Sequence, residues 1–166
     1  MDRVSDFLEQ WRRERPDLDT TPMGVIGRLA RAEQLVSREL RSYFATHDLE
    51  PGEFDVLATL RRSGPPYTLT PGGLASSSMV TAAAVTNRLN RLERKGLVRR
   101  ETDPDNRRTV LVTLTDQGRT LVDRVVVGHL DNEQRLLAPL SEKERAQLAR
   151  LLARLLEGHG DVSTAT

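Results

Sequence analysis

A run of small and hydrogen-bonding residues precedes a series of arginines between positions 81 and 108. Small side chains permit close approach to base edges, threonine and asparagine can hydrogen-bond to bases, and arginine can reach guanine or phosphate. A helix that enters a DNA groove needs the small and polar residues first and the cations one turn later. The residues predicted to contact DNA are Thr81, Ala82, Ala83, Ala84, Thr86, Asn87, Arg88, Arg91, Arg107 and Arg108.

The last two of these arginines follow an Asp/Pro/Asn-rich segment that is typical of a hairpin tip. Arginines at such a tip suit the minor groove, where narrow A·T-rich DNA concentrates negative potential. The nearby Asp103 and Asp105 could orient them. Taken singly, each residue could equally be a solvated surface charge, and it is the spacing of the whole set that favours duplex DNA.

The elements around these residues must place a helix directly beside a hairpin. Val85, Leu89 and Leu92 form one apolar stripe of a helix that Thr81 can cap and Gly96 can end. Residues 97–101 and 109–114 read as paired strands, in which Val110, Val112 and Leu114 alternate with other side chains. The sequence therefore predicts a winged helix-turn-helix.

Helices dominate the rest of the chain, so the expected fold class is mainly α with a small β-wing. Helices are predicted over 5–15, 21–45 with Thr21 as its cap, 53–62 and 115–138, with a short strand near 67–70. A short helix begins at Thr70-Pro71, and a capping box at Ser141–Glu144 begins the last helix. We expect one domain over 1–166: a winged-helix lobe over 50–115, dimerisation helices over 5–47 and 116–158, and a disordered tail over 159–166.

Long apolar stripes lie on the terminal helices, outside this lobe. They include Val25 and Ile26 in the helix predicted over 21–45, Leu130 in the helix predicted over 115–138, and a leucine series from Leu148 to Leu156. A monomer of this size would struggle to cover them, which favours a homodimer. The alternative is a self-contained bundle with the stripes turned inward. Two copies would read two half-sites, so a pseudo-palindromic operator is expected.

Bulk composition narrows the function classes. The formal net charge is +1, yet residues 88–108 contain eight basic and four acidic side chains, so any DNA attraction is local; the alternative is a solvated helix face. The chain has no cysteine, and its three histidines are far apart, so we expect no metal and no cofactor. No apolar run approaches the roughly 20 residues that span a bilayer, so we expect a cytoplasmic protein.

The sequence resembles the MarR family of transcriptional regulators over most of its length, from about Val25 to Leu156. The resemblance rests on positions 74–75, 85–100, 103–104, 107–108 and 112–118. It implies a homodimeric winged-helix regulator, usually a repressor, whose ligand binds between the dimer helices and the DNA-binding lobe. Asn90 and Asn106 stand where the family often has aspartate, and an asparagine cannot form an ion pair with Arg108.

A narrower resemblance is to the urate-responsive branch of the family, through an extra N-terminal helix with Trp11 and the segment 53–62. It implies a pocket for a small anion such as urate formed by Trp11, Asp55, Arg62 and Arg100. Asp55 and Arg62 are two helical turns apart and share a face, and an indole can stack on a purine. Trans-aconitate, citrate or a phenolic ligand are alternatives. The ordinary alternative is that Trp11 packs its helix onto the core and the charges are solvated.

Two other function classes compete with this interpretation. An enzyme is disfavoured because no phosphate loop, nucleophile–base pair or metal-ligand set is visible, and Ser76-Ser77-Ser78 reads as a turn. A helical interaction protein that does not bind DNA would explain the terminal helices, but it would not explain arginines at a hairpin tip after a basic helix.

Overall fold

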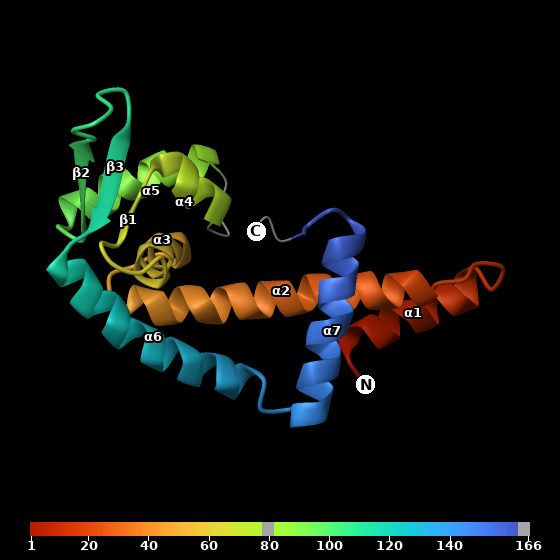
Figure 1. Ribbon diagram of the computed structural model, residues 1–166. Helices are drawn as coiled ribbons and strands as arrows, with labels where there is room; N and C mark the ends of the chain where they lie inside the picture. Colours follow the sequence, from red (N-terminus) through yellow and green to blue (C-terminus); the bar gives the residue numbers. More distant parts are fainter. Residues whose placement is uncertain (78–81, 163–166) are drawn as a thin grey trace. The chain divides into compact units, whose positions relative to one another are not determined.

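The computed structural model of the chain describes residues 1–77 and 82–162 and divides into two compact units, residues 1–126 and a C-terminal unit that begins at Val127. Figure 1 shows the order of the elements. The helices are α1 (Arg3–Glu14), α2 (Thr21–Ala45), α3 (Pro51–Arg62), α4 (Pro71–Ser77), α5 (Ala82–Arg94), α6 (Asp116–Leu136) and α7 (Glu142–Gly158). The strands are β1 (Thr68–Leu69), β2 (Val98–Thr102) and β3 (Val110–Leu114). This is the predicted mainly helical fold with a small sheet.

The core of the first unit lies where α3, α4, α5 and the sheet meet. The predicted stripe of α5, Val85, Leu89 and Leu92, is fully buried against Leu57 and Leu60 of α3. Their burial stabilises the lobe, because the hydrophobic effect scales with the apolar area removed from water. The stripe therefore fixes which side of α5 faces solvent.

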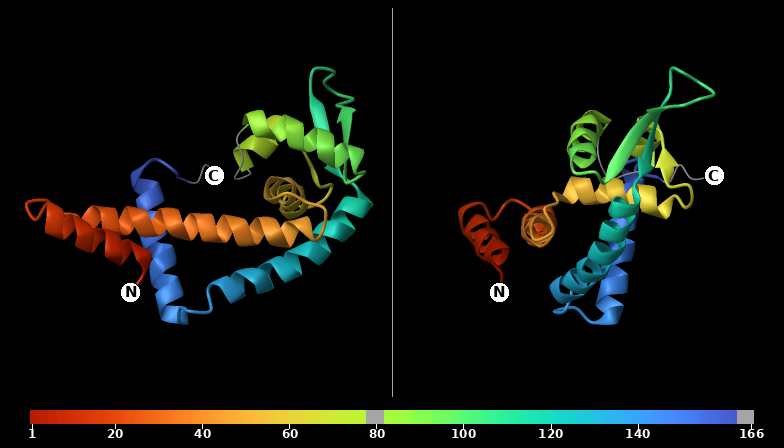
Figure 2. Two further views of the ribbon diagram at one scale, coloured as in Figure 1. Left: turned by 180° about the vertical axis from the view of Figure 1, so that it is seen from behind. Right: turned by 90° about the vertical axis from the view of Figure 1, so that its left-hand side faces the viewer.

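The sheet is antiparallel in the order β1-β3-β2, and β2 and β3 form the predicted hairpin. Figure 2 shows this hairpin projecting away from the helices of its unit. Val112 and Leu114 are buried as predicted, whereas Val110 is 41% exposed. Val110 pairs with Thr102 at the tip end of the ladder, beyond the reach of the core, so its alternation signal was misleading.

Local signals located most helix ends. The Thr70 hydroxyl accepts the Gly73 N–H at 3.0 Å, and Ser141 with Glu144 forms the predicted capping box. Gly96 has φ +69°, the left-handed conformation that ends α5. The prediction that Thr21 caps α2 was wrong. Thr21 is the first helical residue, and its N–H donates to the Asp19 carboxylate at 2.9 Å.

The terminal helices bury little. In α1 only Val4 and Leu8 are buried, against α2, whereas Trp11 is 43% exposed. The C-terminal end of α2 joins the lobe through Phe44, which stacks on Phe54 with 4.5 Å between ring centroids. Val25 and Ile26 of the predicted apolar stripe of α2, and Val36 farther along the same helix, are exposed, so the described residues do not bury this part of α2.

The C-terminal unit shows the same pattern. No residue of α7 is buried, and Leu130 of α6 and Leu148, Leu151, Leu155 and Leu156 of α7 are exposed. No helix in the described part of the chain is long and apolar enough to cross a membrane. The predicted disordered tail falls partly on residues 163–166, which lie outside the described residues.

Candidate DNA-binding surface

The solvent-facing side of α5 is set by the buried stripe on its other side. Thr86, Asn87 and Asn90 are exposed in the N-terminal and central turns, and Arg91 and Arg94 follow on the same side. Hydrogen-bonding side chains ahead of cations is the order that a groove-reading helix requires. Ala82, Ala83 and Ala84 form the first turn of α5, and Thr81 lies outside the described residues.

Arg88 is oriented differently from the rest of the predicted set. A methyl group added to Gly52 of α3 would lie 2.3 Å from the Arg88 Nε and 2.4 Å from its Cζ, so the guanidinium lies directly against the glycine backbone. Its Nη1 is buried, with no hydrogen-bond partner among the described residues. Arg88 therefore faces α3 in this conformation, and the missing side chain of Gly52 makes room for it.

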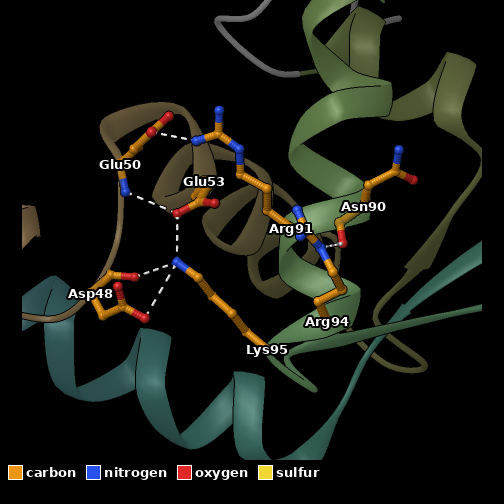
Figure 3. Close-up of polar contacts among 7 residues, drawn as sticks. All are labelled: Asp48, Glu50, Glu53, Asn90, Arg91, Arg94 and Lys95. Carbon is orange, nitrogen blue, oxygen red and sulfur yellow. Dashed lines mark hydrogen bonds and ion pairs between the residues drawn. The ribbon is translucent and has the colours of Figure 1, made fainter.

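Arg91 is exposed but already holds a counter-ion, because its guanidinium pairs with the Glu50 carboxylate just before α3. Figure 3 shows this pair beside a second one, in which the Lys95 ammonium contacts Glu53 at 3.0 Å. Glu50 and Glu53 had no predicted role. Their spacing of three ahead of an apolar helix is a helix-start signal that could have identified them, and the Glu53 carboxylate accepts the Glu50 N–H at 3.0 Å.

The hairpin tip presents Arg107 and Arg108 to solvent, and neither side chain has an ion pair or hydrogen bond within the described part of the chain. The predicted orientation of these arginines by Asp103 and Asp105 is not seen. Asp103 instead accepts the Asp105 N–H at 2.9 Å, and Asn106 accepts the backbone N–H of Arg108 at 3.2 Å. The polar side chains of the tip thus shape the turn and leave both guanidinium groups in solvent.

The base of the hairpin is tied to α5 by Arg100. Its Nε donates to the Glu93 carboxylate at 3.0 Å, and Nη2 makes a second, shorter contact with the same oxygen. These hydrogen bonds hold the pKa of Glu93 below its usual value and raise that of Arg100. The pair couples the direction of the wing to the direction of the helix.

The four residues predicted to bind a small anion have separate surroundings in the part of the chain that the structure describes. Trp11 lines a shallow hollow with Phe7, Gln10 and Glu14 on α1. Arg62 donates to the Ser77 carbonyl at the end of α4, and Arg100 is held by Glu93. Asp55 lies on α3, three residues after Gly52.

A different cavity gathers cations beside α3. It has a volume of about 500 Å³ and lies between the C-terminal part of α2, the start of α3 and α5. Its lining includes the cationic residues Arg41 and Arg88, the apolar residues Leu40 and Leu49, and the acidic residue Glu50. Arg88 was predicted from the sequence to contact DNA, whereas in the structure it lines this cavity. Among residues 1–77 and 82–162, no cluster of three or more His, Cys, Asp or Glu side chains could hold a metal ion.

Comparison with known proteins agrees with this architecture. Residues 49–110 match the model of the MarR family. The chain is 46% identical to the HTH-type transcriptional regulator PecS of Dickeya dadantii over 152 residues, 92% of each chain, and 34% identical to MarR of Escherichia coli over 79% of this chain and 90% of that protein.

Two solved structures share the fold. A MarR variant from Escherichia coli in complex with operator DNA has a TM-score of 0.70 and 30% identity, covering 88% of this chain and 97% of that one. Bordetella bronchiseptica BpsR, described as regulated in DNA binding by 6-hydroxynicotinic acid, has a TM-score of 0.72 and 29% identity, covering 79% and 91%. The relatives are transcriptional regulators and not enzymes. The chain belongs to the MarR family of DNA-binding transcriptional regulators.

Proposed function

We propose that this regulator is a cytoplasmic repressor that binds a pseudo-palindromic operator as a homodimer and is released by a small anionic ligand. The observation that carries the DNA-contact assignment is the exposed side of α5 next to a wing whose two terminal arginines have no counter-ion within the described part of the chain. Thr86 and Asn87 would face base edges in the major groove, Arg91 would reach a backbone phosphate beside them, and Arg107 and Arg108 would reach the minor groove.

The homodimer is supported by the apolar side chains that the terminal helices leave in solvent. Trp11, Ile26, Leu151 and Leu156 are each between 43% and 61% exposed. Exposed apolar surface of this extent is uncommon on a monomer and is covered most economically by the same surface of a second copy. A dimer carries two winged lobes, which suits two half-sites in successive major grooves.

The ligand is proposed to bind near the start of α3, where Arg41 and Arg88 line the cavity described above and Asp55 lies one turn along the helix. A pair of guanidinium groups with apolar walls suits a flat organic anion such as urate. Trp11, Arg62 and Arg100, the other residues proposed to bind the ligand, do not line this cavity, so each would have to reach it from the second copy or through a change of conformation. BpsR, with its aromatic acid, supports this class of ligand.

The test is a fluorescence-anisotropy titration of the purified protein with duplexes from its own upstream region at two salt concentrations. We expect salt-dependent binding that survives excess unrelated duplex, and release by one of urate, xanthine, trans-aconitate, citrate or salicylate. If the protein binds none of the duplexes, the proposed DNA contacts are refuted. If none of the five compounds releases DNA and Trp11 fluorescence stays flat with each, the ligand proposal fails.

The wing is tested separately with Arg108→Ala. We expect weaker binding and a salt slope smaller by about 1, because one phosphate-neutralising cation is lost. Arg13→Ala is the matched control, since Arg13 is an exposed arginine of α1 outside the proposed DNA surface. Equal slopes for both variants would remove Arg108 from the contact set.

A further inference from the structure

Two cations at the C-terminal end of α5 face the start of α3, and both are paired with acids there. Arg91 and Lys95 are one helical turn apart, and Figure 3 shows them directed at Glu50 and Glu53 respectively. The two pairs differ in their exposure to water. That difference separates a fixed contact from an exchangeable one.

The Lys95–Glu53 pair is fixed. The Glu53 side chain is only 1% exposed and accepts both the Lys95 ammonium and the Glu50 N–H at 3.0 Å. Lys95 also donates to the Asp48 carbonyl. Moving Lys95 to a DNA phosphate would leave a buried carboxylate without its counter-charge, which is strongly unfavourable. Lys95 therefore holds α5 on α3 and is not available to DNA.

The Arg91–Glu50 pair is exchangeable. The side chain of Arg91 is 45% exposed and that of Glu50 is 59% exposed. Ion pairs in this setting contribute little net stability, because water and salt screen both charges. A phosphate offers the guanidinium the same kind of oxygen acceptors. The backbone of Glu50, in contrast, is held by Glu53, so its carboxylate stays beside Arg91.

We propose that Glu50 is an internal competitor of DNA phosphate for Arg91. In the free protein the Glu50 carboxylate occupies the guanidinium, and in the complex a phosphate takes its place. Glu50 thereby lowers the affinity for duplex DNA of any sequence, since phosphate contacts carry no base information. This inference rests on the proposed contact of α5 with DNA.

The test compares Glu50→Gln with the wild-type protein by anisotropy on an operator duplex and on an unrelated duplex, across a salt series. We expect binding about twofold to fivefold tighter on both duplexes, the range that an exposed ion pair allows, and a salt slope larger by up to about 0.9. Asp48→Asn is the matched control. It removes one negative charge from the same turn, and Asn tolerates the positive φ of 53° at that position, but the Asp48 carboxylate faces Lys95.

A double-variant cycle with Arg91→Gln assigns the effect. If Glu50 acts through Arg91, the gain from Glu50→Gln disappears when Arg91 is already glutamine. A gain that persists in that background, or that Asp48→Asn reproduces in full, overturns the inference because Glu50 would then act as a general negative charge. No change in Glu50→Gln overturns it as well. These outcomes are distinct from failure of the proposed DNA contacts, in which the wild-type protein itself binds no duplex.

Discussion

The winged-helix lobe and the terminal helices treat their apolar side chains in opposite ways. In the lobe, Leu60, Leu89 and Val112 are enclosed by α3, α5 and the sheet of a single chain. In α1 and α7, Trp11 and Leu151 remain in solvent. Among the described residues, the lobe encloses its own apolar side chains, whereas those of the terminal helices stay exposed. The difference predicts that substitutions in the lobe change its free energy of unfolding. Substitutions on the exposed apolar sides of the terminal helices should instead change the association with a second copy.

The largest expected effect is on the lobe. Leu60→Ala removes a side chain with no exposed surface and should lower the free energy of unfolding by about 2–5 kcal/mol, because it leaves a cavity. Leu155→Ala makes the same chemical change at a side chain that is 42% exposed, and it should leave unfolding of the lobe unchanged. Urea denaturation followed by circular dichroism measures both. Equal losses would mean that the chain itself covers α7.

The next effect concerns assembly. Leu151→Arg places a charge on the apolar stripe of α7 and should convert a dimer into monomers, with DNA affinity lower by about two orders of magnitude because the two lobes no longer bind together. Light scattering after gel filtration and an anisotropy titration measure these changes. Ala146→Arg is the control, since it adds the same charge on the other side of α7. Monomers in both variants, or in neither, would contradict the proposed interface.

A smaller and more selective effect is expected at Gly52, where the lobe meets the end of α2. In Gly52→Ala the new methyl group would overlap the Arg88 guanidinium, which is the mobile end of a long side chain and can move away. We expect unchanged stability, near-normal DNA binding and a weakened response to the releasing ligand. Gly72→Ala is the control, because a methyl group there meets nothing closer than 3.9 Å. A full ligand response in Gly52→Ala would exclude Arg88 from the pocket.

Arg88 also shows where sequence patterns stop being informative. The helical period of Val85, Leu89 and Leu92 correctly predicted the buried side of α5, and Gly96 correctly predicted its end. Periodicity does not say which glycine of another helix lies opposite a given arginine, so the contact of Arg88 with Gly52 was not predictable. The ion pair between Arg91 and Glu50 was not predictable either, because the two residues are 41 positions apart and periodicity relates only residues of one helix.

The terminal helices show a second limit. The apolar stripes of α2 and α7 were recognised, but periodicity identifies only a surface that avoids water and not the chain that covers it. For α2 the answer differs along one helix, since Phe44 is buried by Phe54 of the same chain while Ile26 is 61% exposed. The composition of the stripe is alike at both ends. Only the presence or absence of a neighbouring element distinguishes them.

The smallest expected effect is on the contact that holds α1 to α2. Asp2 caps α1 through the Ser5 N–H at 2.9 Å and accepts the Arg28 Nε at 2.7 Å. The Arg28 hydrogen bond, followed by that of Ser5, lowers the pKa of Asp2 from 3.8 to about 2. A depressed carboxyl pKa stabilises the docked helix above pH 3.8, and that stabilisation is lost as the pH falls toward 2.

Trp11 lies on α1, so we expect the fluorescence of Trp11 to report the release of α1 from α2. This fluorescence should change over this pH window in the wild-type protein. In Asp2→Asn that step should be absent, and the signal at neutral pH should already lie part of the way toward the released value. The change should be modest, because both side chains of the pair are about half exposed and water screens them. Asp17→Asn is the control, since Asp17 pairs with Arg15 two residues away and also has a lowered pKa, but it joins no two helices. An acid step that persists in Asp2→Asn would show that the apolar contacts of Val4 and Leu8 alone hold α1. In that case α1, like the lobe, would be held by apolar side chains that its own chain buries.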